Sequence, residues 1–117
     1  MDLNQAIAKH AEWKVKFRAA ISKQEAMDAD TISKDNCCEL GKWLHGEAKV
    51  KLGKFASYSE CVSKHAAFHV DAGKIARSIN AKRYTEAESM LGGGTSYATA
   101  SNAVAAAIAH LKKEAGL

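Results

Sequence analysis

The 117-residue sequence contains no proline and few clusters of β-branched residues, whereas alanine, lysine and glutamate are plentiful. Such a composition predicts an all-α fold. No apolar run approaches the roughly 20 residues that are needed to span a bilayer. The N-terminus also lacks the basic start and apolar stretch of a signal peptide. We therefore expect a cytoplasmic protein without membrane insertion.

Blocks of basic residues are missing too, although the formal net charge is +4. The lysines are scattered as on a solvated surface, so we expect no nucleic-acid binding. The odd number of cysteines, Cys37, Cys38 and Cys61, favours reduced thiols over a disulfide framework. The chain length suits one domain, which we expect to span residues 1–117.

Apolar residues recur at helical spacing in four segments, approximately residues 2–27, 57–80, 83–91 and 95–115. Asp2 with Gln5 and Ser57 with Glu60 have the spacing of capping boxes at two helix starts. Gly92, Gly93 and Gly94 are expected to form a turn. Long helices with short connections predict an antiparallel four-helix bundle.

The stretch between the first two long segments is expected to be the least stable part of the fold. Residues 28–36 are polar and without periodicity, which predicts a loop. The pattern of residues 38–49 predicts at best one additional short helix, which begins at Cys38. Gly41 and Gly46 fall inside it, and an interior glycine costs a helix about 1 kcal/mol relative to alanine.

Three histidines are expected to face the core. His10 lies within the apolar stripe of the first segment, and His65 and His69 are one helical turn apart on another. Buried imidazoles are costly unless each nitrogen has a partner, and a metal ion would satisfy all three. With Cys38 as a fourth donor, this set suits tetrahedral zinc. The alternative of core histidines held by hydrogen bonds stays open for His65 and His69.

Three short motifs in chain order resemble those of the chemoreceptor zinc-binding domain family. They are H-x-x-W, C-x-L-G-x-W and H-x-x-x-H, which begin here at His10, Cys38 and His65. The resemblance extends over nearly the whole chain. It implies a site of three histidines and one cysteine in a helical bundle, with zinc held by His10, Cys38, His65 and His69. The spacing to Gly41 and Trp43 selects Cys38 over Cys37.

The resemblance also implies a function in bacterial signal transduction. Such domains accompany cytoplasmic chemoreceptors and tend to form homodimers. They sense zinc, or oxidants such as hypochlorous acid through the zinc-bound cysteine, which makes Cys38 the expected redox switch. The expected partner is a chemoreceptor signalling domain, in cis or trans. The alternatives are control of a diguanylate cyclase domain, or a structural helical interaction module.

We expect no enzymatic activity. A zinc hydrolase would need an open metal position and a general base, but only Ala66, Ala67 and Phe68 separate the paired histidines. A di-iron bundle would need more ligating carboxylates and histidines on facing helices. His45 and His110 are expected at the surface, Cys61 in the core, and Gly41 at a close backbone approach.

Overall fold

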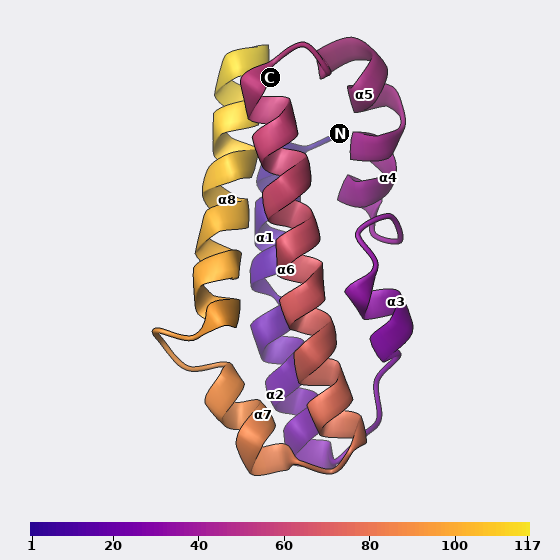
Figure 1. Cartoon of the computed structure of the whole chain (residues 1–117), viewed down its shortest axis with the longest axis vertical. Coiled ribbons are helices and arrows are strands. Elements are labelled where there is room, and N and C mark those ends of the chain that lie inside the picture. The colour runs from indigo at the N-terminus through magenta and orange to yellow at the C-terminus, as the bar shows by residue number, and fades with distance from the viewer.

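The computed structural model describes all residues 1–117, and every regular element in it is a helix, which confirms the all-α prediction. No helix combines the length and the apolar character that crossing a membrane requires. The helices, labelled in Figure 1, are α1 (Leu3–Ala11), α2 (Trp13–Lys23), α3 (Ala29–Ser33), α4 (Glu39–His45), α5 (Glu47–Leu52), α6 (Ala56–Asn80), α7 (Tyr84–Met90) and α8 (Ser96–Ala115).

The helices form an elongated bundle that measures 43 × 25 × 19 Å. Helix α6 runs through its length, with α8 along one side and α1 and α2 behind (Figure 1). The other side is a column of the short helices α3, α4 and α5 (Figure 1). A helical bundle is therefore confirmed, and its fourth side is built from three short pieces instead of one helix.

The first predicted helix is two helices that meet at Glu12, and it ends earlier than expected. Its start is as predicted, because the Gln5 backbone N–H donates to the Asp2 carboxylate at 3.1 Å. Its end is at Lys23, because Gln24 has a left-handed backbone with φ 54°. The side chain of Asn80 then bonds both the N–H and the carbonyl of Met27, which ties the following segment to the end of α6.

The prediction of a loop at residues 28–36 is wrong, because Ala29–Ser33 form α3. Asp28 caps this helix by accepting hydrogen bonds from the N–H and hydroxyl of Thr31. The small residue Gly73 lets α3 lie close on α6, since a Cβ there would come within 2.5 Å of the Ser33 Cβ. Packing against α6 thus stabilises a helix too short to produce a periodic pattern.

The predicted short helix after Cys38 is divided in two by Gly46. Cys38 stands at the N-cap of α4, and its Sγ accepts the Gly41 N–H at 3.3 Å. The close backbone approach expected at Gly41 is confirmed, since a Cβ there would lie 1.8 Å from the Asp35 carbonyl oxygen. Any side chain at this position would force the backbone to shift, so Gly41 fixes how Cys38 enters the helix.

The long helices agree with prediction except at the start of α6. Phe55 is its N-cap, so the capping box predicted for Ser57 and Glu60 is wrong. Ser57 lies in the first turn instead, where its N–H and its hydroxyl both donate to Glu114 of α8. The expected inner face of α8 is buried as predicted, with Tyr97, Val104, Ile108 and Leu111 in the core.

Candidate metal centre

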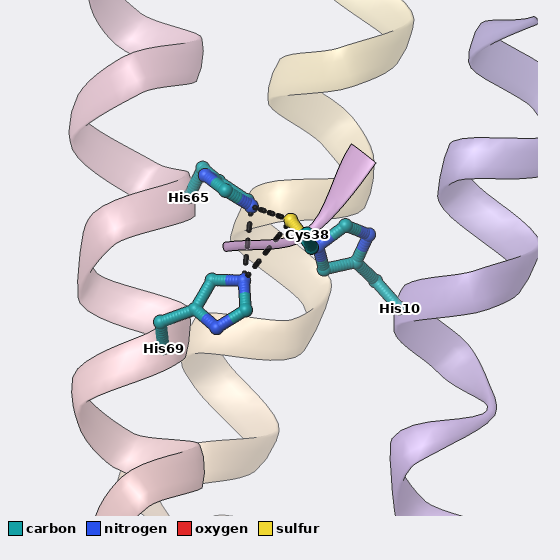
Figure 2. A group of neighbouring side chains, drawn as sticks. All are labelled: His10, Cys38, His65 and His69. Carbon is teal, nitrogen blue, oxygen red and sulfur yellow. Dashed lines mark hydrogen bonds between the residues drawn. The ribbon is translucent and has the colours of Figure 1, made fainter. Parts of the chain in front are cut away.

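The four predicted ligands come together from three separate parts of the chain. His10 projects from α1, Cys38 from the start of α4, and His65 and His69 from successive turns of α6 (Figure 2). One donor atom from each residue lies within 4.8 Å of all the others. Three elements of the bundle therefore converge on one point.

Three of the four donor atoms have spacings that suit a tetrahedral ion, and the fourth, from His10, lies within 4.8 Å of them. The Cys38 Sγ is 3.2 Å from His65 Nε2 and 3.6 Å from His69 Nε2, and the two Nε2 atoms are 3.0 Å apart (Figure 2). Zinc bonds of about 2.0–2.1 Å to nitrogen and about 2.3 Å to sulfur give tetrahedral edges of about 3.3 Å and about 3.6 Å. The three atoms thus stand close to the separations that a shared zinc ion needs.

Backbone carbonyls fix the orientation of two of the imidazoles. His69 Nδ1 lies 2.7 Å from the Ile32 oxygen, and His10 Nδ1 lies 2.8 Å from the Ala6 oxygen. A carbonyl only accepts, so each Nδ1 carries the proton and each Nε2 keeps a free lone pair. Metal-binding histidines are commonly held in this way. The residues present therefore fit a metal ion.

Hydrogen bonds alone do not satisfy this cluster. His10 Nε2 and His65 Nδ1 are buried without a partner. Without a metal, His65 Nε2–H can donate to His69 Nε2. His10 Nε2 and His65 Nδ1 still lack a partner, and each unpaired nitrogen costs about 1–3 kcal/mol of stability. A metal ion would take the lone pairs of all three Nε2 atoms and leave only His65 Nδ1 unpaired. The geometry therefore favours the metal over the interpretation of satisfied core histidines.

The surroundings of the three imidazoles lower their pKa values and so keep them uncharged. Burial is the largest cause that lowers the pKa of His10, His65 and His69, and neighbouring imidazoles lower that of His65 further, to about 3. The rings pack edge to face, with the centroids of His65 and His69 4.5 Å apart. Three uncharged nitrogen donors are therefore available at neutral pH, as metal binding requires.

Cys38 has the opposite tendency, because burial raises the pKa of its thiol more than the Gly41 N–H lowers it. The metal-free site therefore holds a protonated thiol, and a cation beside it would favour the thiolate. Zinc binding should release this proton.

The other cysteines and histidines lie where the sequence predicts. His45 and His110 are exposed, and pair with Asp35 and Glu60 at 3.0 and 3.2 Å. Cys61 is buried in the core and Cys37 is exposed, so neither belongs to the donor group. The contributions that sequence reasoning missed are the carbonyls of Ala6 and Ile32, because main-chain groups leave no signal in the residue types.

Three imidazoles and one thiol converging in a helical bundle define a metal-binding helical domain whose donors are compatible with zinc. The chain belongs to the chemoreceptor zinc-binding domain family, whose model matches residues 10–76, more than half of the chain. Comparison with curated proteins and with solved structures gave no match.

The family match is shorter than the resemblance suggested. It begins at His10 and ends within α6, so α7 and α8 lie outside it. All four donors fall inside the matched stretch. The family is one of regulatory zinc-binding domains and is not known for catalysis.

Proposed function

We propose that this chain is a cytoplasmic zinc-binding sensory domain of bacterial signal transduction, in which His10, Cys38, His65 and His69 hold one zinc ion. The observation that carries the proposal is the convergence of four donors within 4.8 Å, in a member of this family. The proposed domain includes α7 and α8, because α8 packs along α6 and α1.

The sulfur of Cys38 links the metal site to the least regular side of the bundle. The same atom accepts the Gly41 N–H at the start of α4 and faces the Nε2 atoms of His65 and His69. Bound zinc would supply a positive charge that stabilises the thiolate. Cys38 would then tie the start of α4 to α6, and loss of the thiolate would release that tie.

Two inputs act on Cys38 in this proposal. Zinc occupancy itself is the first. Oxidation of the thiolate to a sulfenic acid, for example by hypochlorous acid, is the second, because it weakens the sulfur as a ligand. Cys38 is half-buried while the imidazoles are almost fully buried, so an oxidant meets the sulfur first.

The output is a change in α4 and α5 that biases an attached partner. A local rearrangement of these short helices would alter the surface that a homodimer or a chemoreceptor signalling domain contacts, in cis or trans. A diguanylate cyclase domain is the alternative partner. No catalytic role is proposed, because four protein donors leave no open position and only Ala66, Ala67 and Phe68 separate the paired histidines.

Native mass spectrometry of the zinc-supplied protein tests the metal site. We expect one zinc ion per chain in the wild type and weaker retention in Cys38→Ser. Cys37→Ser is the matched control, because it removes the adjacent exposed thiol, and should retain zinc as the wild type does. If the wild type holds no zinc, a structural helical module is favoured. If both variants retain zinc alike, Cys38 is not a ligand and the four-donor assignment is wrong.

A further inference from the structure

A cleft of about 430 Å³ lies between α1 and the start of α4, beside the metal centre. Its lining includes His10 and Cys38, whereas His65 and His69 do not contribute. Its volume falls within the range of about 300–1,000 Å³ that is common for small-molecule sites. The cleft is thus large enough for an amino-acid-sized compound and opens on one side of the donor group.

A small molecule that enters the cleft would reach the sulfur of Cys38 before the other donor atoms of the metal site. His65, His69 and His10 are 0%, 2% and 5% exposed, whereas Cys38 is only half-buried. A donor atom arriving from solvent therefore approaches the centre from the side of Cys38. The rings of His65 and His69 are shielded by the rest of the bundle.

Charged side chains of both signs line the cleft next to His10 and Cys38. Lys9 precedes His10 and Glu39 follows Cys38, and their side chains form an ion pair of 3.0 Å between α1 and α4. Both side chains are more than half exposed, so water screens this pair and it separates readily. On another wall, the Lys16 ammonium lies 4.6 Å from the centre of the Trp13 ring.

We propose that this cleft binds a small zwitterionic molecule, of the size and charge of a free amino acid, whose side chain carries a zinc-binding donor that would take the place of Cys38. The inference rests on the proposed zinc site. The carboxylate of the ligand pairs with Lys9 and its ammonium with Glu39, in place of the ion pair that these residues make with each other. A third group on the ligand, such as an imidazole, then faces the sulfur.

The exchange itself is a substitution of one donor for another. The ligand nitrogen would take the place of the Cys38 sulfur on zinc, and the freed thiolate would take a proton from solvent. Zinc, held by one protein donor fewer, would then leave faster. No oxidant or reductant is required. The bound ligand raises the local concentration of its donor next to Cys38, which is the benefit of binding before exchange.

The test measures the rate of zinc loss from the zinc-loaded protein at increasing concentrations of L-histidine. Binding before exchange predicts that the rate reaches a plateau. Imidazole, which offers the same donor without the two charges, should give a rate that rises in proportion to its concentration. Two tryptophan substitutions on exposed faces of α1 separate the cleft from the rest of the helix.

Gln5→Trp places a large ring in the cleft, because Gln5 is exposed and lines it. It should lower the rate of zinc loss to L-histidine about tenfold, the loss that corresponds to a contact of about 1.4 kcal/mol. Ala8→Trp is the matched control, because Ala8 is exposed on the same helix outside the cleft, and it should match the wild type.

A proportional rate with L-histidine, or equal rates in Gln5→Trp and Ala8→Trp, would overturn the cleft proposal while zinc binding stands. Failure of the wild type to hold zinc at all would overturn the zinc site first. Equilibrium zinc affinity is measured alongside and should be equal in the two tryptophan variants. A plateau that persists when Lys9→Ala and Glu39→Ala are combined would also contradict the assigned contacts.

Discussion

The two sides of the metal centre are built in different ways. His65 and His69 stand on α6, a single helix of 25 residues whose inner face lies in the core. Cys38 stands between α3, of 5 residues, and α4, of 7 residues. Isolated helices this short are marginal, so this side depends on its packing and on its contacts with α6. The comparison indicates a rigid scaffold for two imidazoles and a separable support for the sulfur.

The largest effect is expected from Gly41→Ala, because this substitution alters the side of the metal centre that is built from short helices. A Cβ at Gly41 would lie 1.8 Å from the Asp35 carbonyl, so the entry into α4 must shift. We expect a loss of about 3 kcal/mol in the free energy of unfolding, as for severe overpacking. Denaturant unfolding measures it.

Gly93→Ala is the control for this substitution, because nothing lies within 4 Å of a Cβ there. Its unfolding free energy should equal that of the wild type. A Gly41→Ala protein as stable as Gly93→Ala would show that the short-helix side does not depend on this close approach.

Removal of zinc should distinguish the two sides most clearly. At a free zinc concentration of 100 times Kd, binding adds about 2.7 kcal/mol to stability. Hydrogen exchange with and without a chelator should show the loss of protection mainly in α4 and α5, and little in α6. Equal loss along α6 would contradict the division into scaffold and separable support.

A smaller effect is expected from Tyr97→Phe, which alters the scaffold alone. The Tyr97 hydroxyl is buried without a partner, and burial raises its pKa to about 12. The folded protein keeps this proton longer than the unfolded chain does, so stability is lost as the pH rises from about 10 to about 12. Tyr97→Phe should remove this loss.

At neutral pH, Tyr97→Phe should be up to about 1 kcal/mol more stable, because an unpaired polar group leaves the core. Thermal unfolding at pH 7 and pH 11 measures both effects. A destabilised variant would reveal a hydrogen bond to this hydroxyl.

The smallest effect is expected from a comparison of the three cysteines by their rates of alkylation, because this experiment changes no residue of the folded protein. With zinc bound, iodoacetamide should modify the exposed Cys37 first and spare Cys61, whose pKa is raised by burial to about 11. Removal of zinc should raise the rate at which iodoacetamide modifies Cys38, but this rate should stay below that of Cys37, because burial raises the pKa of the free Cys38 thiol. Peptide mass spectrometry follows each site, and early modification of Cys38 in the zinc-loaded protein would argue against its role as a ligand.

The same contrast explains what the sequence could predict. The long helices have clear apolar stripes, so α6 and α8 and the inward direction of His10, His65 and His69 follow from periodicity. Helix α3 was missed because five residues give less than two turns of pattern. The true N-cap of α6 was missed because Ser57 is bound by Glu114, a residue far away in the sequence.

The sequence names the four residues that converge, and their role as zinc ligands stays a prediction, whereas the contacts that orient them are not predictable from it. Motif spacing placed Cys38 with the histidines, and all four donors converge. The backbone carbonyls that orient His10 and His69 are placed by the backbone of α1 and by the position of α3. Residue types alone indicate neither. The cleft beside Cys38 likewise arises from tertiary packing.

X-ray absorption at the zinc edge of the loaded protein tests the central claim most directly. We predict three nitrogen neighbours at about 2.0–2.1 Å and one sulfur neighbour at about 2.3 Å. The sulfur signal should vanish in Cys38→Ser and persist in Cys37→Ser. A sulfur signal that survives in Cys38→Ser, or a wild-type spectrum with no sulfur neighbour, would contradict the account.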